Sequence, residues 1–213
     1  MTEPSYVSEP FVDARQQEDA AVIGMWIFLG TELLLFGGLF TGYLAYRSAF
    51  QETFSEAAHH LKLWAGALNT GVLLTSSLTM ALAVEAARAH RRRLLVGLLV
   101  ATALLGMVFL GIKGYEYYKE IEEGLAPFLG EFLYSGVYRE RAELFFNMYF
   151  AMTGLHALHL SGGIGLMLTM VFIARRAPHP GRLRRQVTIS GLYWHFVDVV
   201  WVFLFPMLYL LDR

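Results

Sequence analysis

Five long apolar stretches dominate the pattern of hydrophobic and polar positions along this chain. They cover residues 20–46, 64–87, 94–118, 144–174 and 187–211. Each is longer than an ordinary core helix and long enough for a membrane span, which needs about 20 apolar residues. Backbone groups must satisfy one another inside hydrocarbon, and the alternation of a β-barrel is absent, so the pattern predicts helices. The expected fold class is all-α: a polytopic membrane protein whose residues 20–213 form one bundle of five transmembrane helices.

Composition agrees with a membrane protein. The 213 residues are 56% hydrophobic and 16% charged, whereas an average globular protein carries about 25% charged residues. Cysteine is absent, which excludes disulfides, thiolate metal sites and cysteine nucleophiles. Residues 1–19 are polar and acidic and lack the basic start and cleavage site of a signal peptide, so we expect a flexible tail that is retained.

Basic residues predict how the chain is oriented. Arginines gather in the second and fourth connections: Arg88, Arg91, Arg92, Arg93, Arg175, Arg176, Arg182, Arg184 and Arg185. Both connections lie on the same side of a five-helix protein, and the positive-inside rule places them in the cytoplasm. The N-terminus is then cytoplasmic and the C-terminus outside. Nucleic-acid binding is disfavoured because the arginines flank membrane spans. An aromatic belt is expected on the outer side: Tyr43, Tyr46, Trp64, Tyr115, Tyr117 and Tyr118.

Ionisable side chains occur within the spans, where they are costly and often functional. Glu32 lies near the middle of the first span, and His156 and His159 lie at a similar depth in the fourth. His195 and Asp198 share one face near the middle of the fifth. One carboxylate, two histidines and a His–Asp pair therefore occupy about one level of the membrane.

Other polar and small residues are read as supporting features. Lys113 and Glu116 lie near the outer end of the third span, where their charges are expected to reach the interface. Asn69 contributes to a polar side of the second span. Two pairs with small-xxx-small spacing predict close helix contacts: Gly38 with Gly42, and Ser161 with Gly165.

Three interpretations of the intramembrane polar residues compete. In the first they form a structural hydrogen-bond network between helices. In the second they bind a metal, although the spacings are His-x-x-His and His-x-x-Asp and no span carries the Glu-x-x-His of bundle metal sites. In the third they form a proton path or an ion-transport site. A serine nucleophile is poorly supported because no G-x-S-x-G motif is present.

Five motifs, one in each span, resemble a known family. They are residues 24–32 (GMWIFLGTE), 68–70 with 73–77 (LNT and LLTSS), 111–117 (GIKGYEY), 153–159 (TGLHALH) and 193–201 (YWHFVDVVW). In this order they resemble subunit III of haem-copper terminal oxidases, the cytochrome c oxidase subunit 3 family. The resemblance covers nearly the whole chain from about residue 20 and shifts the weight from metal binding to the structural and proton-support interpretations.

The resemblance implies a non-catalytic role in aerobic respiratory electron transport. Such a subunit holds no haem, copper or catalytic residue. It packs beside the catalytic subunit I, together with subunit II and a small subunit IV, whose haems and copper lie outside this chain. It stabilises subunit I, supports proton uptake and binds phospholipid. Glu32 matches the family's intramembrane carboxylate and His159 or His156 its partner, and Glu116, Trp194 and Trp201 are expected to have structural roles.

The resemblance leaves several alternatives open. Larger family members have seven helices, and this chain is similar to the five-helix form of bacterial oxidases, so we expect a multi-pass protein of the bacterial plasma membrane. Five-helix relatives serve cytochrome c oxidases, quinol oxidases and nitric oxide reductases. A stand-alone ion or proton transporter is a further alternative.

Overall fold

The computed structural model describes residues 10–128, 132–176 and 180–211, and these residues are almost entirely helical. Five helices are long and apolar enough to cross a membrane, which confirms the predicted fold class. They are α1 (Ala14–Ala49), α3 (Leu63–Arg88), α4 (Arg92–Glu122), α5 (Arg139–Arg176) and α6 (Pro180–Phe205), which continues as the π-helix η1 (Pro206–Leu210). A short helix, α2 (Gln51–Ala58), joins α1 to α3.

The helices extend beyond the apolar stretches that predict them. α1 begins at Ala14 because Asp13 caps it by accepting a hydrogen bond from the Gln16 amide at 2.6 Å. The expected flexible tail is therefore helical from residue 14 onward, and residues 1–9 lie outside the described part. α6 begins at Pro180, so the arginines at 182, 184 and 185 belong to this helix rather than to a connection. Hydropathy marks only the part of a helix that lies in hydrocarbon, not its polar ends.

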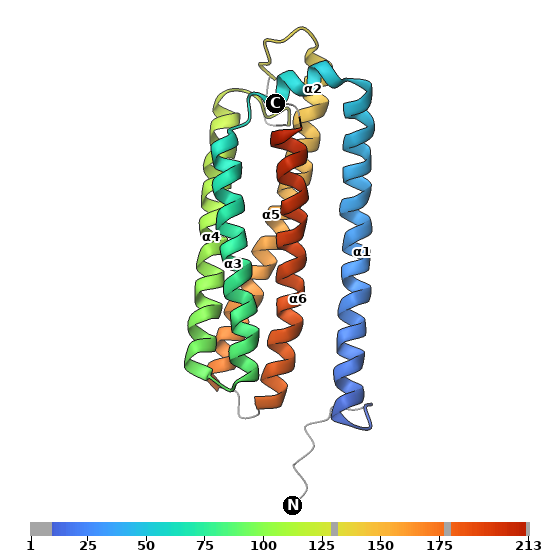
Figure 1. The fold of residues 1–213 in the computed structure, drawn as a ribbon. Coiled ribbons are helices and arrows are strands. Elements are labelled where there is room, and N and C mark those ends of the chain that lie inside the picture. The colour runs from blue at the N-terminus through green and yellow to red at the C-terminus, as the bar shows by residue number, and fades with distance from the viewer. Residues whose placement is uncertain (1–9, 129–131, 177–179, 212–213) are drawn as a thin grey trace, which may run out of the picture.

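The long helices alternate in direction, and α1 lies at the side of a bundle formed by α3, α4, α5 and α6 (Figure 1). The N-terminal end of α1, the turn between α3 and α4, and the adjoining ends of α5 and α6 share one end of the molecule. α2 and η1 lie at the other end. Of the side chains in α1, Leu29, Phe36 and Tyr43 are buried, spaced by seven residues. α1 therefore docks along one narrow seam, mainly on α5 and α6.

Trp194 of α6 organises the packing of the bundle. It is fully buried, and its indole N–H donates to Ser76 Oγ of α3 at 3.1 Å. Gly106 of α4 and Gly163 of α5 face its ring: a Cβ added at these positions would lie 2.9 and 3.1 Å from ring atoms of Trp194. Glycine at both positions leaves the space that the indole occupies.

Aromatic side chains fill the end of the bundle near α2. Phe54 of α2 packs on Tyr43 and Phe145, with ring centroids 5.6 and 5.4 Å away. Tyr43 is fully buried and donates to the Met207 carbonyl at 3.0 Å. Tyr43 thus does not belong to an interfacial belt, and Tyr117 also packs inward, on Phe150 at 4.9 Å. The other four expected belt residues are exposed: Tyr46, Trp64, Tyr115 and Tyr118.

Candidate functional site

Polar side chains inside the bundle fall into separate groups rather than one network. One group joins α1 to α5, a second joins α3 to α6, and a third joins α4, α5 and η1. The helices and the polar partners differ from one group to the next.

Glu32 of α1 pairs with His159 of α5. The distance between Glu32 Oε2 and His159 Nε2 is 2.9 Å. The other ring nitrogen, Nδ1, lies 2.9 Å from the Leu155 carbonyl oxygen, which can only accept a hydrogen bond, so Nδ1 must carry its proton. A single proton then lies between Nε2 and the carboxyl group. The pair is electrically neutral whether that proton lies on the acid or on the imidazole, as a group surrounded by lipid requires.

His156 lies one helical turn from His159 but does not join this pair. It is buried between Phe109 and Trp201, with ring centroids 5.4 and 5.3 Å away. Neither of its ring nitrogens has a hydrogen-bond partner among the described residues. Asn69 is likewise fully buried, with both amide atoms unpartnered within the described part of the chain. Buried polar atoms of this kind are usually satisfied by ordered water.

His195 and Asp198 form the second group, with Ser77 of α3. His195 Nδ1 and Ser77 Oγ are 2.9 Å apart. The nearest Asp198 oxygen lies 3.9 Å from the same nitrogen, too far for a hydrogen bond. The Asp198 side chain is buried, whereas 37% of the His195 side chain is exposed, on the side of α6 that faces α1. The His–Asp pair therefore connects the bundle interior with the space beside α1.

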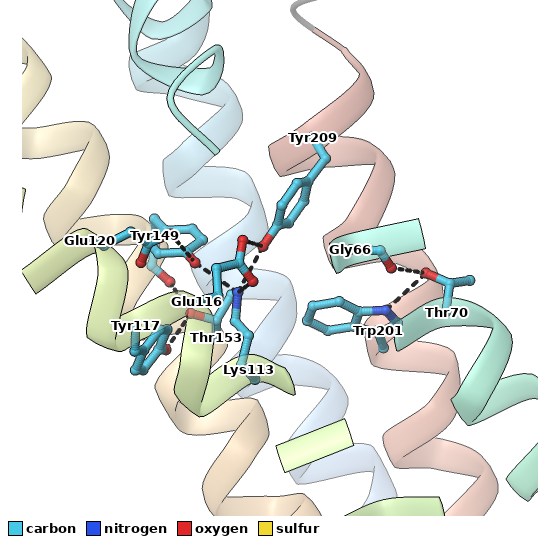
Figure 2. A network of polar contacts seen from close by, with 10 residues as sticks. All are labelled: Gly66, Thr70, Lys113, Glu116, Tyr117, Glu120, Tyr149, Thr153, Trp201 and Tyr209. Atoms are coloured by element: carbon cyan, nitrogen blue, oxygen red, sulfur yellow. Dashed lines mark hydrogen bonds and ion pairs between the residues drawn. The ribbon is translucent and has the colours of Figure 1, made fainter. Parts of the chain in front are cut away.

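The third group is a buried cluster around Lys113 that we term the lysine cluster (Figure 2). Lys113, Glu116 and Glu120 of α4 are at most 3% exposed. The ammonium group of Lys113 donates to Glu116 Oε2 at 3.0 Å and to the hydroxyl groups of Tyr149 and Tyr209, each at 2.7 Å. The expectation that Lys113 and Glu116 reach the interface is wrong, because α5 and η1 cover them with polar partners.

Tyrosine hydroxyl groups complete the lysine cluster. Tyr209 donates to Glu116 Oε1 at 2.7 Å, and Tyr149 donates to Glu120 Oε1 at 2.8 Å. One ammonium group thus faces two carboxyl groups, and the cluster is neutral only if these carboxyl groups together hold one proton. Burial strongly disfavours a net charge, so we infer that one of the two acids is protonated.

The spacing of the lysine cluster could have been found in the sequence. Lys113, Glu116 and Glu120 recur at i, i+3 and i+7, which places all three on one helix face. The apolar stretch predicted for this helix ends at residue 118 and leaves Glu120 out, whereas α4 continues to Glu122.

Tryptophans provide the remaining polar links between helices. Trp201 donates from its indole nitrogen to Thr70 Oγ1 at 3.0 Å, and Thr70 donates in turn to the Gly66 carbonyl at 2.9 Å (Figure 2). Trp194 and Trp201 are both fully buried. The described residues contain no group of three or more histidine and acidic side chains arranged to hold a metal ion. Together, these polar contacts fix the five long helices relative to one another.

Comparison with known proteins identifies relatives along nearly the whole chain. The sequence model of the family described as cytochrome c oxidase subunit III matches residues 14–212. Cytochrome c oxidase subunit 3 of Thermostichus vulcanus is 34% identical over 201 residues, which are 94% of this chain and 92% of the relative. The corresponding protein of Synechocystis is 34% identical over 194 residues, 91% of this chain and 76% of the relative. A probable quinol oxidase subunit 3 of Staphylococcus haemolyticus is 30% identical over 202 residues, 94% of each chain.

Proposed function

This chain belongs to the cytochrome c oxidase subunit III family, and from that premise we propose that it stabilises the catalytic subunit I of a haem-copper terminal oxidase and supports its proton uptake. As a subunit III it is a membrane protein that works in a complex with other oxidase subunits. In our proposal subunit I is its main neighbour, and subunit II and a small subunit IV complete the assembly.

The observation that carries this proposal is how the intramembrane charges are arranged. Glu32 is hydrogen-bonded to His159 at 2.9 Å, and Lys113 lies between Glu116 and two tyrosines. Groups held in this way lock helix positions and registers, as a scaffold requires. In this proposal the haems and copper of the oxidase belong to the partner subunits, and this chain binds none of them.

Bound phospholipid is part of the proposal. Arg92, Arg93 and Arg175 line a cavity of about 490 Å³ with Val96, where α4 and α5 meet at their arginine-rich ends. Basic pockets of this type between helices attract anionic lipid head groups. The same arginine-rich end supports the proposed orientation, with the N-terminus in the cytoplasm and the protein in the bacterial plasma membrane.

The experiment that tests the proposal is purification of the chain in mild detergent with its native partners. We expect haem- and copper-containing subunits to co-purify with it. In the purified oxidase, Glu32→Ala should shorten the time over which activity persists during turnover and leave the haem spectrum unchanged. Glu52→Ala, on an exposed carboxylate of α2, is the matched control and should behave as wild type.

Three results would contradict the proposal: a redox centre in the isolated chain, ion flux through the chain alone in liposomes, or a changed haem spectrum in Glu32→Ala. The first two would assign catalysis or transport to this chain. The third would connect Glu32 directly with the redox site rather than with support of the fold.

A quinol oxidase is the second candidate complex, favoured by the similarity to the Staphylococcus haemolyticus protein. Measurement of oxygen consumption by the purified complex with reduced cytochrome c and with a quinol distinguishes the two. The proposed supporting role is the same in either complex.

A further inference from the structure

A membrane-facing groove separates α1 from α6 near the middle of their spans. Its volume is about 310 Å³, at the lower end of the range of small-molecule sites. The lining residues come from these two helices: Trp26, Leu29, Gly30, Leu33, Leu192, His195, Phe196 and Val199. The single ionisable side chain among them is His195.

The imidazole of His195 is fixed so that one nitrogen is left for a ligand. Its Nδ1 lies 2.9 Å from Ser77 Oγ on the bundle side. Among residues 10–128, 132–176 and 180–211 the hydrogen bond of this ring is the one at Nδ1, which leaves Nε2 without a partner there. The side chain is 37% exposed and lines the groove. A ring nitrogen of this kind can donate or accept one hydrogen bond, according to its tautomer.

The depth of His195 restricts which molecules can reach it. This residue lies halfway along the span Gly181–Leu210. A phospholipid phosphate would have to leave the interface for the bilayer centre, where no cation lines the groove, so a charged head group is excluded. An acyl chain would fit the apolar walls but would leave Nε2 facing hydrocarbon without a partner.

We propose that this groove binds an uncharged, membrane-soluble molecule of the quinone class, with a ring oxygen hydrogen-bonded to Nε2 of His195. Trp26 and Phe196 provide aromatic surfaces on opposite walls for a planar ring. Gly30 lets the ring approach the backbone of α1, since nothing lies within 4 Å of a Cβ built there. Leu33 and Val199 offer an apolar surface for an isoprenoid tail. The site goes beyond the supporting role proposed above and involves no redox step.

Photolabelling of the intact purified oxidase tests this site. The probe is an azidoquinone with a short isoprenoid tail, and labelled positions are mapped by mass spectrometry of subunit III peptides. We expect labelling in the peptides that contain Trp26 and Phe196. Gly30→Phe should fill the groove and leave His195 and Ser77 in place, and His195→Phe should remove the hydrogen bond. Each should reduce labelling at least about tenfold, the effect of losing one good interaction.

Gly37→Phe is the matched control, because Gly37 lies two turns along the same helix, has open space around it and does not line the groove. It should label like wild type. The proposal is overturned if wild type is not labelled at these peptides or if Gly30→Phe is labelled equally. It is also overturned if a photoactivatable phosphatidylglycerol labels the groove and excess quinone does not compete. If His195→Phe does not assemble, the Gly30→Phe comparison alone decides.

Discussion

At the scale of single residues, the ionisable groups in the membrane are matched in charge by specific partners. Glu32 and His159 form a hydrogen bond between α1 and α5. Lys113 donates to the Glu116 carboxyl group and to the hydroxyl groups of Tyr149 and Tyr209. Removal of one member leaves a partner that the surrounding helices cannot easily satisfy. The penalty for such an unpaired group exceeds the net contribution of the intact bond.

His159→Leu is expected to destabilise the subunit by about 1–3 kcal/mol, because Glu32 loses its hydrogen-bond partner within the membrane. The double variant Glu32→Leu/His159→Leu should recover much of this loss, since neither polar group remains. The measurement is thermal unfolding of the detergent-solubilised complex for both single variants and the double variant. Additive losses in this cycle would show that the two residues do not interact.

Lys113→Met should be more damaging than His159→Leu, with a loss of about 3–5 kcal/mol, because the one negative charge shared by Glu116 and Glu120 would be left buried without its cation. Lys119→Met is the matched control, since Lys119 pairs with Glu122 on the same helix at the same i, i+3 spacing but near the surface. This control should change little. Equal unfolding temperatures for the two variants would show that the buried lysine cluster does not contribute to the stability of the subunit.

At the scale of helices, glycine contacts rather than small-xxx-small motifs determine how the bundle packs. Gly106 and Gly163 contact Trp194, whereas nothing lies within 4 Å of a Cβ built at Gly38 or Gly165. The motif pairs predicted from spacing thus do not mark the tight contacts in this structure. Spacing reports which residues share a face, but only the partner helix decides which face is buried.

Gly163→Leu is expected to lower the free energy of unfolding by at least about 1–3 kcal/mol, because the larger side chain would collide with the indole of Trp194. Gly165→Leu on the same helix should be tolerated, as its surroundings are open. The yield and thermal stability of each variant in mild detergent provide the comparison. A well-folded Gly163→Leu protein would mean that Trp194 can move without loss.

The sequence predicts the helices better than it predicts their polar contacts. All five spans follow from hydropathy, because the cost of an unpaired backbone in lipid leaves few alternatives. The approach of Glu32 to a histidine of α5 follows from depth alone, but depth does not distinguish His159 from His156. The lysine cluster was missed because hydropathy cannot show that η1 folds over Lys113 and supplies Tyr209. Such contacts depend on how each helix is rotated about its axis. The sequence does not specify this rotation, because apolar side chains occur on all faces of each helix.

At the scale of the whole molecule, the arrangement of the connections predicts which ends share a side of the membrane. His60 follows α2 at one end and His90 follows α3 at the other, and both are exposed. Because the chain has no cysteine, His60→Cys and His90→Cys each introduce a unique thiol. A membrane-impermeant maleimide should label His60→Cys from outside and His90→Cys only from the cytoplasm. The reverse pattern would invert the proposed orientation.

The position of α1 at the side of the bundle has a consequence for how the protein is made. α1 is synthesised first, yet it docks on α5 and α6, which are synthesised last. The Tyr43 hydroxyl reaches the Met207 carbonyl, 164 positions later in the chain. During translation α1 is therefore made before the helices on which it packs, so Glu32 has no histidine partner until α5 has been synthesised. A chain that ends before α5 would leave the Glu32 carboxyl group without the His159 imidazole that it contacts in the complete bundle.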